Sequence, residues 1–314
     1  MQIYTFALID NLPFYTIDED NMQNAYNSPL LVFIEKIEKV NFKTGEIYYI
    51  NKRKYLNLTF SFKIDSQEKL QELTVRGSVH KFYNGGLHNA NTMSFNDFKT
   101  TLDKYVSLFG LDLTKCELLP FEYGTNLYLN EFSNYNIDNI ILNTYCVKRK
   151  MFNCNAGIDT SLISGTSKTE VRIKFYSKSA EYPKYCNNTL RIEDKLTKTR
   201  GVTSKGINYV SDLYDIKNHK ILLEKHLENI SNIVLYDYTM KIPKNSKYLT
   251  LSKKYRNPIF WKKLIRNCKN GKEYNTKYNE EVGKLNSMSK KYGSNILQIL
   301  LQQTKNQSLK GLNL

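Results

Sequence analysis

The chain has 314 residues, of which 41% are hydrophobic and 13% aromatic, and 24 of them are tyrosines. This composition indicates a folded protein with a sizeable core, in one elaborate domain or two smaller ones, and excludes a largely disordered chain. The formal net charge of +16 favours a polyanionic partner, because cations that neutralise phosphates release counterions. Nucleic acid and an anionic membrane surface both fit this charge.

The cysteines and the apolar runs bear on the cellular location. Five cysteines without a Cys-x-x-Cys pair predict reduced thiols, with neither a disulfide framework nor a zinc site. No cleavable leader opens the chain, and no apolar run reaches the ~18 residues that a bilayer-spanning helix needs. We therefore expect a cytoplasmic protein with no membrane partner.

The first third of the chain predicts strands followed by a helix. Residues 31–64 alternate apolar and polar side chains, which is typical of a meander of strands, and residues 73–83 predict another strand. Ser94 is a good helix N-cap and Gly110 a good helix stop. The apolar residues between them recur on one face, so an amphipathic helix is expected there.

Residues 111–240 predict a second mixed region. The run FEYGTN, residues 121–126, lies in a predicted strand whose Gly124 would let a backbone or ligand approach closely. A short helix is expected within residues 133–148 and a loop over residues 157–167. A helix within residues 211–230 and a last strand from residue 233 complete the region.

Residues 170–195 are the stretch around which we expect the rest to be organised. Two alternating runs flank a turn-rich segment that contains Pro183, which predicts an antiparallel hairpin. Because side chains alternate along a strand, one face gathers a phenol, a carboxylate and several cations, which suits phosphodiester chemistry. The same pattern also fits a solvated sheet face with cross-strand ion pairs. The side chains of this face are Arg172, Lys174, Tyr176, Arg191 and Glu193.

The end of the chain is strongly basic. From residue 251 onward it has fourteen Lys and Arg against three Glu, and three stretches have helical patterns. We expect a region of two or three basic helices over residues 241–314. Lys262, Lys263 and Arg266 are its candidate contacts to a polyanion, while Trp261 fits either an aromatic platform or helix packing.

Several short motifs resemble those of a known family. Gly165 in a turn is followed by Tyr176-Ser177-Lys178, then Glu181, then Arg191-Ile192-Glu193. This order resembles the replication initiation factor family, the rolling-circle initiators of plasmids and phages, together with the related filamentous-phage gene II/X type. The runs GSVHKFYNGG, residues 77–86, and FEYGTN resemble two further motifs of that family. The resemblance spans roughly residues 77–215.

This resemblance implies a fold and a domain organisation. The expected fold is α+β, with an antiparallel β-sheet of two related strand-helix-strand halves packed by helices, as in rolling-circle initiators. The predicted organisation is a nicking and DNA-binding domain over residues 1–240 and a basic helical C-terminal region over residues 241–314.

The resemblance also implies an activity. Members of the family nick and rejoin single-stranded origin DNA through a covalent tyrosine-phosphate link, with Mg²⁺ or Mn²⁺ held by His and carboxylates. Matching positions give Glu122, Glu193 and His80 as metal ligands, and Tyr176 with Lys178 as catalytic residues. Phosphate contacts are expected from these cations: Arg172, Lys174, Arg191, Lys262, Lys263 and Arg266. The implied partners are single-stranded or cruciform origin DNA, a host helicase and a second copy of the chain.

The chain departs from the family at two points. The attacking tyrosine of the plasmid branch lies two residues before the turn glycine, where this chain has Ile163. Tyr176 is the nearest substitute, with Tyr145, Tyr182 and Tyr185 as further candidates. The chain also has no His-hydrophobic-His triplet, so the metal site could consist of carboxylates alone.

Two other functions remain open at this point. A non-catalytic, sequence-specific DNA-binding initiator on the same scaffold is favoured by the missing tyrosine. A structural protein that packages nucleic acid fits the charge, although the acid-bearing strands count against it. An ATP-driven helicase is unsupported, because the chain lacks a Gly-x-x-x-x-Gly-Lys-Ser/Thr loop.

Overall fold

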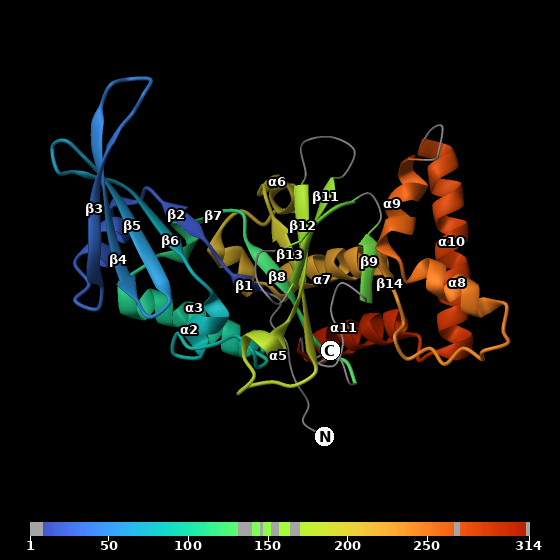
Figure 1. Cartoon of the computed structure of the whole chain (residues 1–314). Coiled ribbons are helices and arrows are strands. Elements are labelled where there is room, and N and C mark those ends of the chain that lie inside the picture. Colours follow the sequence, from blue (N-terminus) through green and yellow to red (C-terminus); the bar gives the residue numbers. More distant parts are fainter. Residues whose placement is uncertain are drawn as a thin grey trace.

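The described residues form an α+β structure with two six-stranded antiparallel sheets, a two-stranded sheet and a group of C-terminal helices (Figure 1). The computed structural model describes residues 9–130, 140–144, 147–151, 157–163, 170–266 and 271–311. Figure 1 shows the first sheet at the left, the second sheet in the middle and helices α8 to α10 at the right.

The first sheet has six strands in the order β3-β4-β5-β6-β2-β7, and every neighbouring pair is antiparallel. The meander predicted over residues 31–64 is therefore confirmed. Strand β4 runs without a break to Tyr55, and the chain reverses at Leu56, whose φ is 52°. The strands are β2 Phe14–Thr16, β3 Val32–Val40, β4 Ile47–Tyr55, β5 Leu58–Asp65, β6 Leu70–Arg76 and β7 Glu117–Leu118.

Helix α3 packs on this sheet and matches its prediction. It begins after Ser94, which forms a capping box with Asp97, and it ends at Gly110, whose φ is 65°. Its buried face shares one core with Phe60 and Phe62 of β5. The helices and the 3-10 helix of this half are α1 Glu19–Tyr26, α2 Val79–Tyr83, α3 Phe95–Phe109 and η1 Leu113–Lys115.

The second sheet carries the predicted hairpin at its centre, in the order β1-β8-β13-β12-β11-β10. β12 and β13 are antiparallel, as predicted, and β13 also pairs with β8. Gly124 of β8 lies opposite Glu193, and a Cβ there would lie 2.1 Å from the carbonyl oxygen of Ile192, so only glycine fits. The strands are β1 Ile9–Asn11, β8 Glu122–Tyr128, β10 Val147–Met151, β11 Gly157–Ile163, β12 Glu170–Ser177 and β13 Thr189–Leu196.

The remaining elements of this half connect and cover the second sheet. Strands β9 and β14 form a separate antiparallel pair. Helix α7 buries Leu222 and Ile230, and Ile230 packs in one core with Ile173 and Phe175 of β12. These elements are β9 Ile141–Thr144, α5 Lys178–Glu181, α6 Arg200–Thr203, the 3-10 helix η3 Val210–Tyr214, α7 Ile216–Ser231 and β14 Ile233–Leu235.

Several sequence predictions differ from the structure. The strand predicted over residues 73–83 ends at Arg76, because Gly77 adopts a φ of 150° and Ser78 caps helix α2. The loop predicted over residues 157–167 is strand β11 in its described part. The short helix predicted within residues 133–148 is replaced by β9 and the start of β10 where the chain is described. The expected single sheet of two halves is two separate sheets, and a relation between the halves stays a prediction.

The C-terminal region is helical, with four described helices where two or three were expected, and α8, α9 and α10 share a core with β14. Trp261 is buried and its indole N–H donates to the carbonyl oxygen of Tyr255 at 2.8 Å, so it packs helices and offers no exposed platform. Trp261 shares this core with Leu285 of α10 and Val234 of β14. The helices are α8 Tyr248–Tyr255, α9 Pro258–Arg266, α10 Gly271–Tyr292 and α11 Ile296–Gly311.

The last helix does not stand apart from the second sheet. Ile296 and Leu300 of α11 are buried in the same core as Ile173 and Ile192 of the hairpin. The domain boundary near residue 241 stays a prediction, but α11 belongs to the packing of the sheet. Among the described residues, no helix has both the length and the apolar character to cross a bilayer.

A buried carboxylate fixes the joint between α10 and α11. Asp237 follows β14 and is 1% exposed. It accepts hydrogen bonds from the Ser289 hydroxyl at 2.6 Å, the Asn295 amide at 2.8 Å and the Thr239 amide at 3.0 Å. Asp237 thereby ties the end of the first 240 residues to the last two helices.

Replacing Asp237 is expected to loosen this joint. Asp237→Ala leaves several buried donors unpaired, so we expect it to lower the free energy of unfolding by about 3 kcal/mol. Urea unfolding followed by circular dichroism measures the change. Glu224→Ala, on the exposed side of α7, is the matched control and should change stability by less than about 0.5 kcal/mol. Equal stability of the two variants would contradict the role of Asp237.

Candidate functional site

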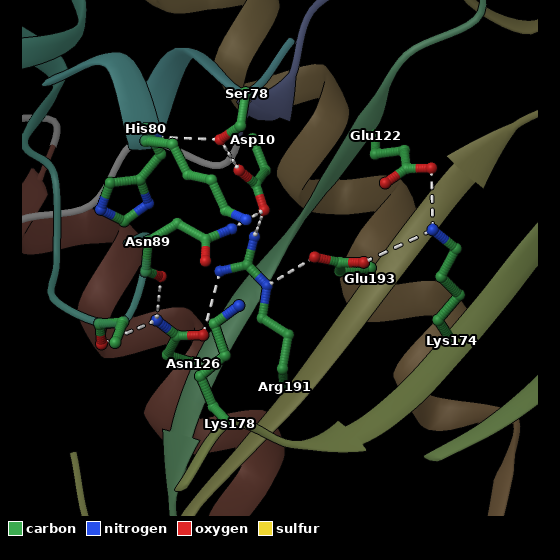
Figure 2. Close-up of polar contacts among 12 residues, drawn as sticks. Asp10, Ser78, His80, Asn89, Glu122, Asn126, Lys174, Lys178, Arg191 and Glu193 are labelled. Atoms are coloured by element: carbon green, nitrogen blue, oxygen red, sulfur yellow. Dashed lines mark hydrogen bonds and ion pairs between the residues drawn. The ribbon is translucent and has the colours of Figure 1, made fainter. Parts of the chain in front are cut away.

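A cavity of about 610 Å³ lies between the second sheet and the connection from β6 to α2. Both sheets contribute to the cavity. The second sheet supplies β1 and β8, which pair with each other, and the residues that follow β6 of the first sheet place Ser78 in the cavity wall. Figure 2 shows the polar side chains that gather there. Its charged and hydroxyl-bearing lining includes Asp10, Ser78, Glu122, Lys174, Tyr176 and Glu193.

The buried guanidinium of Arg191 is the centre of the polar network (Figure 2). It is 1% exposed, and it donates to Glu193 Oε1, Asn126 Oδ1 and Asp10 Oδ2, each at 3.0 Å. Burial opposes its charge, but the carboxylates of Asp10 and Glu193 raise the pKa of Arg191 above its usual range. The cation is therefore permanent and joins three strands.

Asp10 is a site residue that the sequence did not reveal. It also accepts hydrogen bonds from the Ser78 hydroxyl and, at 2.6 Å, from the Asn89 amide. Burial opposes its ionisation, yet Arg191 outweighs this and holds the pKa of Asp10 well below its usual range. In the sequence Asp10 interrupts the first apolar run, and the Ile9-Asp10 step resembles the start of gene II/X type initiators, but neither feature indicates a partner 181 positions away.

Of the predicted catalytic pair, Tyr176 lines the cavity, and Lys178 is fully buried beside it. The Tyr176 hydroxyl donates to Glu193 Oε1 at 2.7 Å, and Lys178 Nζ lies 3.4 Å from the same hydroxyl. Burial and Glu193 raise the pKa of Tyr176 far above its usual range. Burial also raises the pKa of Glu193 and, together with Arg191, lowers the pKa of Lys178. All three groups are thus shifted toward their neutral forms.

Glu122 and Glu193 lie on neighbouring strands and share a lysine. Lys174 Nζ is 2.8 Å from Glu122 Oε1 and 3.8 Å from Glu193 Oε2 (Figure 2). Lys195 Nζ is also 2.8 Å from Glu122 Oε1. Burial opposes the ionisation of Glu122, but the two lysines hold its pKa below the usual range. The structure therefore brings the two predicted acids together, with an ammonium group between them.

His80 does not join the two acids. Its Nε2 is 2.9 Å from Asn91 Oδ1, and Figure 2 shows its ring pointing away from Glu122 and Glu193. In the part of the chain that the structure describes, no three or more His, Cys, Asp or Glu side chains are grouped as metal ligands. Two acids that already neutralise lysines are a poor fit to a divalent ion. The metal and its three proposed ligands stay a prediction.

The predicted phosphate contacts have different environments. Arg191 is buried and Lys174 is ion-paired, so their present contacts position the acids, whereas Lys263 on α9 is exposed. Their contact with DNA stays a prediction. The side chains of Arg172, Lys262 and Arg266 lie outside the described residues, as do Gly165 and Tyr145.

Two of the alternative tyrosines cluster beside the site. The rings of Tyr182 and Tyr185 both contact His88, with centroid separations of 6.3 and 3.9 Å. Lys178 Nζ lies 4.9 Å from the centre of the Tyr182 ring and 5.0 Å from that of Tyr176. Lys178 therefore lies between the partly buried Tyr176 phenol and this aromatic cluster.

A second buried network lies on the opposite face of β13. Asp194 Oδ2 is 3.0 Å from His226 Nδ1, and His226 Nε2 is 3.0 Å from the Thr125 hydroxyl. The order carboxylate, imidazole, hydroxyl matches that of a nucleophilic triad. Thr125 is fully buried, however, so a substrate has no access to it. These contacts attach α7 to the sheet that carries the site.

Comparison with known proteins gives one structural neighbour at low similarity. No family model matches the chain, and no curated protein matches it. A solved structure titled as a rolling circle replication initiator protein from Geobacillus stearothermophilus is 10% identical, with a TM-score of 0.35. The match covers 79% of this chain and 95% of that one.

The buried imidazole of His80 predicts a loss of stability in acid. Burial lowers its pKa to about 4, below the ~6.5 of an unfolded chain, so the unfolded state takes up a proton first as the pH falls. The stability that the neutral His80 imidazole contributes is fully present above pH ~6.5 and is lost progressively as the pH falls to 4. We expect the free energy of unfolding to fall about 3 kcal/mol less for His80→Gln than for the natural chain.

Urea unfolding at a series of pH values between 6.5 and 4 measures this difference. His88→Gln is the matched control, because that ring is only partly buried and its replacement should change the slope far less. Parallel stability curves for the natural chain and His80→Gln would show that the site does not hold a neutral imidazole.

Because the Lys174 ammonium lies between Glu122 and Glu193, removing it is expected to raise the affinity of these acids for a divalent metal ion. Lys174→Met removes the cation from Glu122 and Glu193, so we expect the variant to bind Mn²⁺ at least about tenfold more tightly than the natural chain. Titration calorimetry measures the affinity. Lys225→Met, an exposed site on α7, should leave it unchanged. Equal Mn²⁺ affinity of Lys174→Met and the natural chain would contradict the competition.

Proposed function

We propose that the protein initiates rolling-circle replication by nicking and rejoining one DNA strand through Tyr176. The observation that carries this proposal is the Tyr176 hydroxyl, which lines a cavity while donating to Glu193 at 2.7 Å with Lys178 3.4 Å away. A phenol, an acceptor for its proton and a cation are the groups that tyrosine attack on a phosphodiester requires.

The reaction follows from these contacts. Glu193 takes the phenol proton as Tyr176 Oη forms a bond to the phosphorus of the scissile phosphate. The bond from phosphorus to the sugar oxygen breaks, and Lys178 protonates that leaving oxygen. The result is a tyrosine phosphodiester and a free hydroxyl end. The reverse steps rejoin the strand, because the phosphodiester bond is exchanged and not hydrolysed.

The shifted pKa values suit these roles. A carboxylate whose pKa is raised is a better proton acceptor, and an ammonium whose pKa is lowered is a better proton donor. The raised pKa of Tyr176 keeps the phenol protonated until Glu193 takes its proton during attack. Arg191 holds Glu193 in place through its Nε at 3.0 Å.

The predicted Mg²⁺ or Mn²⁺ has no assigned step. A divalent ion bound near the phosphate would supply charge stabilisation to the reaction. Lys174 and Lys195 already neutralise Glu122, which leaves this acid poorly suited to a second cation. The proton transfers above are therefore derived for the chain's own residues.

The DNA-binding part of the proposal rests on charge. Exposed cations on the C-terminal helices can reach phosphates, which fits single-stranded or cruciform origin DNA as the partner. A host helicase remains part of the same proposal. Exposed Lys and Arg of these helices include Lys253, Arg256, Lys263, Lys290, Lys291 and Lys305.

A non-catalytic DNA-binding initiator is the second candidate function. Two observations favour it: Ile163 stands where the plasmid branch has its tyrosine, and burial makes the Tyr176 phenol hard to ionise. In that case the Arg191 network would only stabilise the fold, and the exposed Lys and Arg side chains would bind DNA.

The covalent intermediate provides the test. We expect the natural chain to form a denaturation-resistant adduct with single strands tiled across the DNA around its own gene. Tyr176→Phe removes the attacking oxygen and should reduce the adduct at least about 10³-fold. Gel electrophoresis of the labelled strand measures it. Tyr182→Phe and Tyr185→Phe are the matched controls and should retain the adduct.

Other outcomes separate the two candidate functions. A full yield of adduct from Tyr176→Phe would remove this tyrosine from the reaction. The second function would be favoured if the natural chain forms no adduct, with or without Mn²⁺, yet shifts one DNA fragment over random DNA in a salt-dependent manner.

A further inference from the structure

Among the residues that the structure describes, nothing pairs with the outer edge of strand β3 in the first sheet. It is the outermost strand in the order of that sheet, and Figure 1 shows it at the outer end of the molecule. All nine of its residues except Ile37 are exposed. Such an edge offers free backbone donors and acceptors to another strand. The apolar side chains exposed on it and just beyond it are Val32, Phe33, Ile34, Val40 and Phe42.

The pairing of β3 with β4 determines which backbone groups face outward. The Asn41 amide donates to the carbonyl oxygen of Glu46 at 2.8 Å, so residues 41 and 46 are a hydrogen-bonded pair. Hydrogen-bonded and non-bonded pairs alternate along an antiparallel ladder. The next pair, Val40 with Ile47, is therefore non-bonded. It follows that Lys36, Glu38 and Val40 direct their backbone groups away from β4.

The sequence of β3 is complementary to itself about Ile37. If two β3 strands pair antiparallel about Ile37, Lys36 of one strand lies opposite Glu38 of the other, and Glu35 lies opposite Lys39. An antiparallel pair of two such strands would thus place a cation against an anion at every one of these positions. Residues directly opposite on neighbouring strands share a face and contact each other, so these pairs are favourable.

We propose that β3 pairs antiparallel with β3 of a second copy of this chain, with the two-fold axis at Ile37. Residues 36 and 38 both direct their backbone groups outward, so their pairing across the axis forms ladder hydrogen bonds. Exposed Val40 and Phe42 at one end of β3 meet the exposed apolar residues at the other end, because the strands run in opposite directions.

Neighbouring registers are disfavoured by charge and by backbone direction. A shift of the axis to Lys36 places two lysines opposite each other, and a shift to Glu38 places two glutamates opposite each other. An axis between two residues pairs outward backbone groups with inward ones. The bulge between Phe33 and Glu35 and the charges would hinder other partners, which is how edge strands commonly avoid promiscuous pairing.

Groups within the chain also contact these side chains. Lys52 Nζ lies 2.8 Å from Glu35 Oε1, and Lys36 Nζ lies 4.5 Å from the centre of the Tyr49 ring. Both lysines remain partly exposed, so a second copy can approach without breaking either contact. An isologous pair of this kind continues the first sheet from one copy into the other and presents two cavities per assembly.

Charge reversal at residues 36 and 38 tests this pairing on the full chain. Sedimentation velocity measures the oligomeric state. We expect the natural chain to sediment as a dimer whose fraction rises with concentration. Lys36→Glu sets two glutamates against each other at both symmetry-related pairs, and Glu38→Lys sets two lysines against each other in the same way. Each single variant should therefore sediment as a monomer.

Restoring the opposite charges should restore the dimer. The double variant Lys36→Glu, Glu38→Lys pairs opposite charges again and should be dimeric, and so should a mixture of the two single variants. Lys43→Glu, at the hairpin tip beyond the paired residues, is the matched control and should remain dimeric. Circular dichroism confirms that each variant is folded. A monomeric natural chain, or single variants that stay dimeric, would overturn the proposal whether or not the protein nicks DNA.

Discussion

The structure depends on one buried cation. Arg191 reaches across the second sheet to an amide on β8 and a carboxylate on β1, and its own strand supplies the third acceptor. A guanidinium without these partners would be very costly at 1% exposure, so its charge forces three segments into one arrangement. The same constraint sets the position of Glu193 and, through Glu193, the orientation of the Tyr176 hydroxyl. The Arg191 guanidinium therefore stabilises the fold and also positions the groups of the candidate site.

The local parts of the fold could be predicted from the sequence. Alternation between residues 171 and 193 correctly indicated the hairpin and its inner face, and Ser94 with Gly110 marked the ends of α3. These features depend on neighbours a few positions apart. Helix α2 was missed because it has only five residues, too few for a helical period to show, and the turn at Gly77 separates it from β6.

The candidate site was only partly predictable, for a different reason. The alternation placed Tyr176 and Glu193 on one face, but it implied a solvated face. The structure instead covers that face with Asp10 and the segment after α2, which removes Arg191 from solvent. Alternation reports which side chains point the same way and carries no information on what lies above them. For the same reason the sequence did not show that Lys174 would stand between the two acids.

The packing of α11 bears on how the chain matures during synthesis. Ile296 and Leu300 fill the core beneath the hairpin, although they follow it by a long stretch of sequence. While the ribosome is still making residues 241–295, α7 can already pack on this core, but the part of it that Ile296 and Leu300 fill is still exposed to water. The core under the cavity is therefore complete only when the last helix has emerged, and chaperone binding during that interval would protect the apolar side chains still exposed.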